Sequence, residues 1–315
     1  MTAQEIINLQ TTKTEKMRLL FELGLTRRQV SEMLGVGYGF AQNVYAKLHG
    51  TSRTNRRTIQ ELVQEATFNF LFNRNFGVEI EAYGVTRRAL ALALRNEGIE
   101  VQEEGYNHET RTWWKIVSDG SIQGQDSFEL VSPILNGENG LEQLKKVCKV
   151  LKQKNAKVNR TCGLHIHFDA SEFNLSHWKN IIWNYATLEP TIDGFLPNSR
   201  RGNNNQYCRS MRVPNYQRRI NQTITLENLE RSLTGRNRYF KVNIQSYWRH
   251  RTIEFRQHSG TIEFEKISNW ILFLARFLEF SKTNKIQNGT FNELNHFLNQ
   301  KLINYFQKRQ QQFAA

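Results

Sequence analysis

The chain has few residues of the kinds that cross-link, interrupt or disorder a protein. Its 315 residues include only 3 cysteines, Cys148, Cys162 and Cys208, which lie far apart and form no Cys-x-x-Cys pair. This spacing predicts reduced thiols, and it argues against a disulfide framework and against a zinc knuckle. Only 4 prolines and the lack of a low-complexity run argue against long disordered segments.

Long apolar stretches are also lacking. The first 30 residues contain no apolar stretch of the kind that a signal peptide needs. The longest apolar run, Trp270–Ala275, is too short to cross a bilayer and is followed by Arg276. We therefore expect a cytoplasmic protein that has no membrane partner.

Acidic residues are scarce relative to basic ones. The chain holds 43 lysines and arginines against 29 acidic residues, a formal net charge of +14. The excess is uneven, because residues 200–260 hold 13 basic and 3 acidic residues, and residues 1–60 hold 9 and 4. Two basic regions indicate two kinds of anionic partner, and for each region a merely solvated basic surface is the alternative.

Residues 13–49 have the pattern of three short helices. Apolar residues recur at helical spacing over 14–23, 27–34 and 38–48, with glycines in the turns between them. The run from Leu25–Thr26 through Val30 to Leu34–Val36 resembles the helix-turn-helix DNA-binding family. On that resemblance the nucleic-acid-contacting residues of the last helix are Tyr38, Gln42, Asn43 and Lys47. A packing or oligomerisation role for this unit is the alternative.

A basic linker follows the three helices. Its arginines, Arg53, Arg56 and Arg57, are candidates for contacts with nucleic-acid phosphates, and an ordinary solvated hinge is the alternative. We predict a helix-turn-helix module over 1–50, the linker with a short helix over 51–69, and a second domain over 70–315. The expected inward side chains of the module are Met17, Leu20, Phe21, Val30, Met33, Leu34, Phe40, Val44 and Leu48.

From residue 70 onwards strand and helix patterns do not alternate strictly. Strands are predicted over 76–83, 99–103, 113–118, 127–132, 163–169, 239–245 and 251–258, and helices over 86–97, 139–154, 174–187, 263–281 and about 291–311. This order predicts an α+β fold, in which an antiparallel sheet has helices packed on one face. The polar residues 195–225 are predicted to form a long loop.

Four of the predicted strands alternate polar and apolar residues. Successive side chains of a strand point to opposite faces, so the polar residues of each strand share one face. These residues are Glu79 with Glu81, Glu129, His165 with His167, and Glu254 with Arg256 and His258. If the polar faces converge, they supply carboxylates and histidines for a divalent metal and an arginine for a phosphate. Alternatively, these are exposed salt-bridge partners and buried structural histidines.

Over residues 70–281 the chain resembles the carboxylate–amine ligases of the glutamine synthetase-like superfamily, and most closely the amidoligase family. The segments that match are Phe76–Glu81, Asp119–Ser121, Glu129–Pro133, Cys162–Asp169 and Ile253–Thr261. The resemblance implies an enzyme that depends on ATP and on Mg²⁺ or Mn²⁺. Such an enzyme phosphorylates a carboxylate to an acyl phosphate, and an amine then displaces the phosphate to form an amide.

The resemblance also implies roles for individual residues. The implied metal ligands are Glu79, Glu81, Glu129, Glu254 and a histidine, assigned to His165, and the resemblance leaves open whether His167 touches the metal instead. The implied catalytic residues are Arg256, Glu254 and His167, with Arg256 and His165 also at the nucleotide phosphates. The polar loop contains four further candidates, Arg200, Arg201, Arg209 and Arg212. They could bind nucleotide phosphates or an acidic substrate, or they could merely be solvated. Asp119 could simply close a turn.

Two other functions stay open at this point. One is a DNA-binding regulator whose ligase-like domain senses a ligand without catalysis, and the other is a metal-dependent hydrolase. The intact Glu-x-Glu, His-x-His and Glu-x-Arg patterns argue against a decayed site, and Arg256 favours the ligase. The carboxylate and amine substrates of a ligase could be amino acids, peptides, proteins or cell-wall fragments.

Overall fold

The computed structural model describes residues 2–49 and 73–314. The chain divides into two compact units, Met1–Leu62 and Val63–Ala315. The predicted linker over 51–69, with Arg53, Arg56 and Arg57, lies outside the described residues. Among the helices that are described, none combines the length and the apolar character that a membrane span requires.

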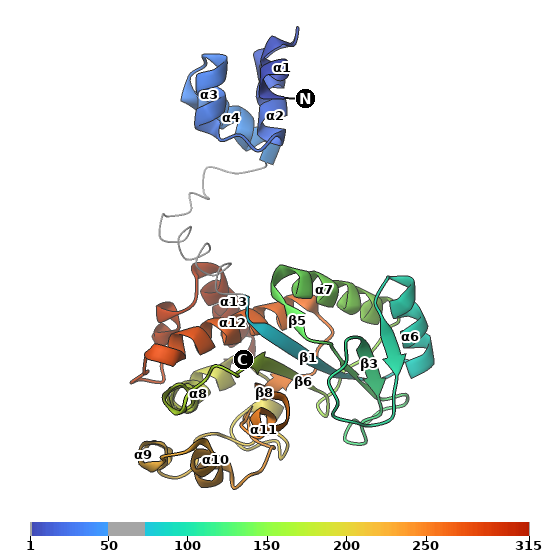
Figure 1. Ribbon diagram of the computed structural model, residues 1–315, viewed down its shortest axis with the longest axis vertical. Helices are drawn as coiled ribbons and strands as arrows, with labels where there is room; N and C mark the ends of the chain where they lie inside the picture. Colours follow the sequence, from blue (N-terminus) through green and yellow to red (C-terminus); the bar gives the residue numbers. More distant parts are fainter. Residues whose placement is uncertain (1, 50–72, 315) are drawn as a thin grey trace. The chain divides into compact units, whose positions relative to one another are not determined.

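The described part of the N-terminal unit is helical (Figure 1). Its helices are α1 Ala3–Asn8, α2 Lys13–Glu22, α3 Arg27–Leu34 and α4 Tyr38–His49. The first three begin at threonines (Thr2, Thr12 and Thr26) whose side chains accept a hydrogen bond from the helix backbone. Gly35, with φ of 58°, ends α3 in the left-handed conformation that glycine adopts readily. The three predicted helices are confirmed, and α1 was not predicted.

The core of this unit differs in part from the prediction. Most of the expected side chains are buried, together with Ile6 and Ala41. The prediction was wrong for Met33, Phe40 and Leu48, which are 38%, 45% and 36% exposed. The inward face of α4 runs through Ala41 and Val44, and Phe40 lies about 100° around the helix from Ala41, so it points away from the core.

The C-terminal unit is built on one eight-stranded sheet with the order β2-β3-β4-β1-β6-β8-β7, and β5 pairs with β1. The strands are β1 Asn75–Ala82, β2 Val101–Glu103, β3 Trp114–Val117, β4 Phe128–Val131, β5 Leu135–Asn136, β6 Gly163–Asp169, β7 Val242–Asn243 and β8 Thr252–Ser259. Of the paired strands, β2 and β3 run parallel and the others antiparallel. The predicted α+β fold is confirmed, and the sheet, predicted to be antiparallel, is so except at the parallel pair β2–β3.

Helices cover the apolar face of this sheet (Figure 1). They are α6 Arg87–Asn96, α7 Gly137–Gln153, α8 Leu175–Gly194 and α12 Phe264–Thr283, and α13 Gln300–Ala314 packs against α8 and α12. The ring of Phe255 in β8 lies 5.5 Å from that of Tyr185 in α8 and 6.3 Å from that of Phe277 in α12. Because the apolar side chains point to this core, the polar side chains of the same strands point to the opposite face.

Several boundaries were predicted incorrectly. Residues 195–225 are not one loop, because they contain the 3-10 helix η1 Asn198–Arg200 and the helix α9 Tyr216–Gln222, and α10 Leu226–Thr234 follows. The strand predicted over 239–245 shortens to β7, and α11 Ser246–His250 follows it. α8 continues through Pro190 instead of ending at 187, and η2 Phe291–His296 precedes α13. Sparse buried residues such as Ile220 are too few to give a helical period in a polar sequence.

A glycine after β8 allows the start of β6 to approach closely. The amide of Gly260 donates a hydrogen bond to the carbonyl oxygen of Cys162 at 2.8 Å. A Cβ on Gly260 would lie 3.0 Å from that carbonyl's carbon and oxygen, and closer still to the Cβ of Cys162. Gly260→Ala should therefore lower the free energy of unfolding by about 1–3 kcal/mol, the usual cost of overpacking.

Urea unfolding followed by tryptophan fluorescence measures this effect, because all 6 tryptophans lie in the C-terminal unit. Gly105→Ala is the control, since a Cβ there meets nothing within 4 Å, and it should change the free energy by less than about 0.5 kcal/mol. Equal stability of wild type and Gly260→Ala would contradict the close packing of the two segments.

Candidate active site

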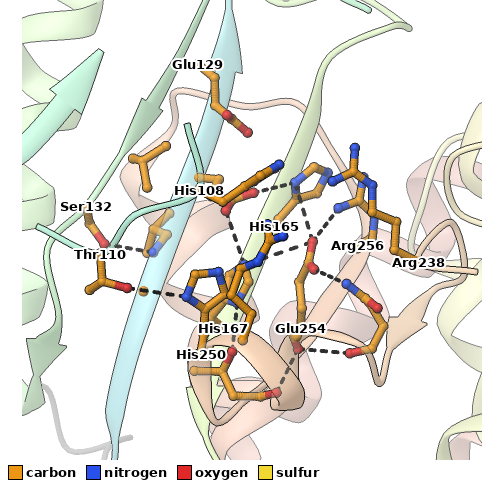
Figure 2. Close-up of a pocket in the computed structure, with 18 of the residues that line it drawn as sticks. His108, Thr110, Glu129, Ser132, His165, His167, Arg238, His250, Glu254 and Arg256 are labelled. Carbon is orange, nitrogen blue, oxygen red and sulfur yellow. Dashed lines mark hydrogen bonds and ion pairs between the residues drawn. The ribbon is translucent and has the colours of Figure 1, made fainter. Parts of the chain in front are cut away.

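The polar face of the sheet forms the floor of a cavity of about 1310 Å³ (Figure 2). The seven predicted residues that line it are Glu79, Glu81, Glu129, His165, His167, Glu254 and Arg256. The strand register places Glu79 opposite His165, Glu81 opposite Glu129, and His167 opposite Glu254. Four strands that lie far apart in the sequence thus bring their polar side chains to one place.

Two histidines lie between the carboxylates of neighbouring strands. The Nδ1 atom of His165 is 2.9 Å from Oε2 of Glu79, and its Nε2 atom is 3.5 Å from Oε1 of Glu81. The Nε2 atom of His167 is 3.2 Å from Oε1 of Glu79. Both imidazoles also lie within 4.0 Å of Oε1 of Glu254. Each histidine can therefore share a bound cation with at least one carboxylate.

Neighbouring groups hold these side chains in place. Oε2 of Glu81 accepts a hydrogen bond from the Gly163 amide at 2.6 Å. Oε2 of Glu254 accepts one from Nδ2 of Asn243, also at 2.6 Å. Nδ1 of His167 is hydrogen bonded to Oγ1 of Thr252 at 3.0 Å.

Neither Asn243 nor Thr252 was predicted as a supporting residue. Thr252 continues the two-residue period of Glu254 and Arg256, so that period was the signal for it. Asn243 lies on a separate two-residue strand, and nothing in its own segment marks it.

Arg256 lies, partly buried, at the end of this group. Its Nη1 atom pairs with Oε1 of Glu254, and its Nε donates to the carbonyl oxygen of Tyr207 at 3.3 Å. Burial alone would lower the pKa of Arg256, but the carboxylates of Glu254 and Glu79 outweigh it and raise that pKa. The guanidinium is thus a permanent positive charge beside the carboxylates.

A buried ion cluster supports the strand of Arg256 from the helix side. Nζ of Lys241, which is fully buried, lies 2.8 Å from Oε1 of Glu189 and 2.6 Å from Oδ1 of Asp193. Glu189 also accepts a hydrogen bond from the Met211 amide at 2.8 Å. The carbonyl oxygen of Lys241 accepts the amide of Arg256 at 2.9 Å. This cluster joins α8, the polar loop and β8 behind the site.

The ligand atoms fall into three groups that could each hold a metal ion. The groups are Glu79 with His167 and Glu254, Glu79 with Glu129 and His165, and Glu81 with Asp119 and Glu129, and in each the ligand atoms lie within 4.8 Å of one another. Oxygen-rich sets of this kind suit Mg²⁺, and the imidazoles also suit Mn²⁺. Asp119 closes a turn as well, because its Oδ1 accepts the Ser121 amide and hydroxyl, both at 2.7 Å.

The pKa shifts show a local excess of negative charge. Burial, followed by the charges of Glu79, Glu81 and Asp119, raises the pKa of Glu129 well above its usual range. Burial also acts to raise the pKa of Glu79, but the two histidines outweigh it and lower that pKa well below its usual value. A divalent cation would relieve the repulsion at Glu129, so the residues present fit a metal site.

Of the four loop arginines, only Arg200 lines the cavity. Its side chain is buried, Nη2 donates to the carbonyl oxygen of Cys162, and Nε has no hydrogen-bond partner among the described residues. Arg201 instead donates to the carbonyl oxygens of Leu196 and Phe313. The guanidinium carbon of Arg209 lies 5.8 Å from the ring of Phe240, and Arg212 is exposed outside the cavity. The structure therefore does not bring Arg201, Arg209 or Arg212 to the cavity.

His258 was predicted to share the strand face of Glu254 and Arg256, and this prediction was wrong. The register of β8 against β6 shifts between Leu164 and Ile166, a bulge that places one extra residue in β8. The ring of His258 therefore packs 5.5 Å from that of Trp270 in α12. Its pKa falls to about 3 because it is buried.

Other cavity residues were not singled out as site residues by any motif in the sequence. They are Tyr106, His108 and Thr110 of the β2–β3 loop, Lys115 of β3, Arg238 and Tyr239 before β7, and Trp248, Arg249 and His250 at α11. No periodic pattern links these segments to the four strands. They meet at the cavity only through the tertiary structure.

In the N-terminal unit, the predicted nucleic-acid contacts lie on α4 and are largely exposed. Tyr38, Asn43 and Lys47 are exposed, and Tyr38 is 52% exposed. Gln42 is only half exposed, because its Oε1 accepts a hydrogen bond from Nη1 of Arg27 at 2.7 Å. Gln42 would have to release Arg27 before it could reach a base.

Comparison with known proteins identifies relatives of the C-terminal unit. A family model described as "Putative amidoligase enzyme" matches residues 72–278. No curated protein matches the chain. Solved structures that resemble it include a bifunctional glutathione synthetase from Pasteurella multocida (14% identity, TM-score 0.42) and a novel glutamine synthase homolog (11% identity, TM-score 0.40). The first comparison covers 82% of this chain and 49% of the synthetase, and the second 80% and 69%. The chain thus spans about half the length of the synthetase.

The raised pKa of Glu129 predicts how the stability of the metal-free protein depends on pH. A carboxyl group whose pKa is raised by folding stabilises the protein below its unfolded pKa of about 4.3, and this contribution is lost as pH rises through the folded pKa. Glu129→Gln should therefore raise the free energy of unfolding by about 1–2 kcal/mol at pH 7.5 in EDTA, and change it little at pH 4. No described residue donates a hydrogen bond to the Glu129 carboxylate, so the glutamine side chain of the variant breaks no hydrogen bond.

Urea unfolding at the two pH values in EDTA measures the effect. Added Mn²⁺ should stabilise the wild type more than Glu129→Gln, because binding to the folded state alone adds to its stability. A variant that is less stable than the wild type in EDTA at pH 7.5 would contradict the repulsion inferred for Glu129.

Proposed function

The chain belongs to the amidoligase family of enzymes, which form carbon–nitrogen bonds, and we propose that it is an ATP- and divalent-metal-dependent carboxylate–amine ligase. One observation carries the proposal: three overlapping groups of carboxylate and imidazole ligand atoms lie beside Arg256 on the floor of one cavity. Carboxylates that hold metal ions beside an arginine are the parts needed to bind a nucleotide triphosphate and to offset charge during phosphoryl transfer.

We assign the metal ligands from the side chains that line the floor. They are Glu79, Glu81, Glu129, His165 and Glu254, and the geometry adds Asp119. When bound, Mg²⁺ or Mn²⁺ would neutralise phosphate charge and polarise the γ-phosphoryl group. Burial and the neighbouring carboxylates together raise the pKa of Glu129, and this cost of its negative charge is the local reason for the assignment.

In the proposed reaction an oxygen of the substrate carboxylate attacks the γ-phosphorus of ATP. The bond to the bridging oxygen breaks, and ADP leaves with the electron pair. The amine nitrogen then attacks the acyl carbon of the resulting acyl phosphate, an amide bond forms, and inorganic phosphate leaves. In this scheme the transferred phosphoryl group is bound by Arg256 and by Arg200, whose Nε has no hydrogen-bond partner among residues 2–49 and 73–314.

His167 is the residue proposed to accept the proton of the attacking amine. Thr252 is hydrogen bonded to Nδ1, and Nε2 lies 3.2 Å from Glu79. Burial acts to lower the pKa of His167, but Glu254 and Glu79 outweigh it and raise that pKa. A raised pKa makes the imidazole a stronger base for this step.

Substitutions at the floor test the proposal. Glu81→Ala and Glu254→Ala should each lower the rate about 100-fold or more, because each removes a metal ligand from the open face without emptying the core behind it. Arg256→Lys should also lower it, because lysine cannot form the bidentate contact with phosphate. The assay traps the acyl phosphate with hydroxylamine, in the presence of ATP, Mg²⁺ and a mixture of carboxylic acids, and measures the hydroxamate.

Arg231→Lys is the matched control, since Arg231 is exposed and lies outside the cavity, and it should leave the rate unchanged. EDTA should abolish hydroxamate formation, and Mn²⁺ should restore it. An undiminished rate in Glu254→Ala would defeat the assignment of that ligand. Release of phosphate without hydroxamate would instead favour a hydrolase.

We propose a second function, nucleic-acid binding, for the N-terminal unit. The helix α3, the turn at Gly35 and the helix α4 follow one another as in a helix-turn-helix, and α4 exposes Tyr38, Asn43 and Lys47. Residues 1–60 also hold an excess of five positive charges, 9 basic against 4 acidic residues. In this proposal Lys47, Arg53, Arg56 and Arg57 contact phosphates, whereas Tyr38, Gln42 and Asn43 reach base edges.

A gel-shift titration on duplex DNA at two salt concentrations tests this function. Removal of residues 1–60 should abolish the shift, and Lys47→Gln should reduce the salt dependence by about 0.9 log units per log unit of salt. Lys13→Gln, an exposed lysine on α2, is the control and should leave the shift unchanged. Absence of binding at low salt, or equal binding after the truncation, would indicate an adaptor or dimerisation role.

A further inference from the structure

The cavity extends well beyond the carboxylate–histidine floor. Its volume of about 1310 Å³ exceeds the roughly 300–1,000 Å³ that is usual for one small ligand. Its outer part, which we call the basic mouth, is lined by Tyr106, His108, Arg238, Trp248, Arg249 and His250. Figure 2 shows His108, His250 and Arg238 around the central histidines and Glu254. This outer part has no role in the reaction steps described above.

The basic mouth is held in place by specific contacts. The Nζ atom of the buried Lys115 donates to Oδ1 of Asn107 and to the carbonyl oxygen of Glu109, both at 2.8 Å. Lys115 thereby ties the β2–β3 loop to the sheet. On the same loop, Oγ1 of Thr110 lies 3.4 Å from Nδ1 of His250 at the end of α11. The loop and α11 therefore border the cavity together.

The two arginines of the mouth have no carboxylate partner among the described residues. Nη2 of Arg238 donates to the hydroxyl of Tyr239 at 3.3 Å, and Arg249 is exposed and forms no ion pair. By contrast, Arg256 on the floor pairs with Glu254. Burial, with the charges of Arg249 and Arg238, lowers the pKa of His108. The mouth is therefore electropositive, whereas the floor is electronegative.

The mouth also presents aromatic surface. Tyr106 and Trp248 line the mouth and are 54% and 43% exposed. Trp248 is not free to turn away, because its Nε1 donates to Oε2 of Glu230 at 2.8 Å. Fixed, exposed aromatic rings beside unpaired arginines are typical of surfaces that bind other molecules.

We propose that the basic mouth binds acidic residues of a peptide substrate whose reacting carboxyl group reaches the floor. This inference rests on the ligase function proposed above, in which one substrate supplies a carboxyl group to the floor. The remainder of that substrate must leave through the mouth, where unpaired guanidiniums suit carboxylates and the rings suit a chain that extends beyond one amino acid. The cavity volume leaves room for the nucleotide and for this chain together.

Fluorescence anisotropy of a fluorescein-labelled hexaglutamate peptide on the full-length protein tests the proposal. Arg249→Gln and Arg238→Gln should each weaken binding by about 10- to 100-fold, as expected for loss of a charged hydrogen bond. Arg231→Gln removes the same charge outside the cavity and should change the Kd less than twofold. Arg249 is exposed, so its substitution keeps the test valid if Arg238→Gln fails to fold.

Competition identifies the ligand class. Unlabelled hexaglutamate should displace the probe, whereas free glutamate at a 100-fold higher concentration should not. Displacement by free glutamate, or by a single-stranded oligonucleotide more readily than by hexaglutamate, would overturn the peptide assignment. Equal peptide affinity of wild type, Arg249→Gln and Arg238→Gln would overturn the site itself. Binding of ATP and Mg²⁺, measured separately by calorimetry, should be unchanged in Arg249→Gln. Absence of this binding in the wild type would count against the ligase function, whatever the peptide affinity.

Discussion

The structure of the C-terminal unit depends on holding several carboxylates close together on one face of a sheet. Glu79, Glu81, Glu129 and Glu254 repel one another, and burial makes their charge costlier still. The histidines and Arg256 offset part of this charge, and the raised pKa of Glu129 shows that the compensation is incomplete. A protein can keep such a group only if the strands beneath it cannot move apart, because the carboxylates would otherwise separate.

The rigidity comes from the opposite face of the same strands. Their apolar side chains pack against α8 and α12, with Tyr185, Phe255 and Phe277 in contact. The buried cluster of Lys241, Glu189 and Asp193 then joins α8 to the segments that precede Arg256. A site of high charge density is thus supported by an apolar core and by one buried ion cluster, each on the side away from the ligand.

The cavity also separates two kinds of charge. Its floor carries carboxylates and suits cations, and its mouth carries Arg238 and Arg249 without carboxylate partners among the described residues. The floor therefore suits cations and the mouth suits anions, so a ligand that carries both charges would be bound in one orientation. The β2–β3 loop, tied down by Lys115, keeps the two regions adjacent.

Alternation along single strands was sufficient to predict the floor, because the two-residue period is a local property of extended backbone. It placed Glu79 with Glu81 and His165 with His167 on one face. The short helices of the N-terminal unit were predicted from a pattern that is equally local. The period failed at His258, where pairing with β6 introduces a bulge that His258's own segment does not reveal.

Only the tertiary structure decided which distant segments complete the site. Asn243 of the floor, and Arg238 and Arg249 of the mouth, are brought there by strand pairing and by loops anchored elsewhere. Likewise, Arg200 enters the cavity whereas Arg201 turns to Phe313, although the two are adjacent in a basic loop. Composition marks such residues as polar, but their direction depends on contacts between residues far apart in the chain.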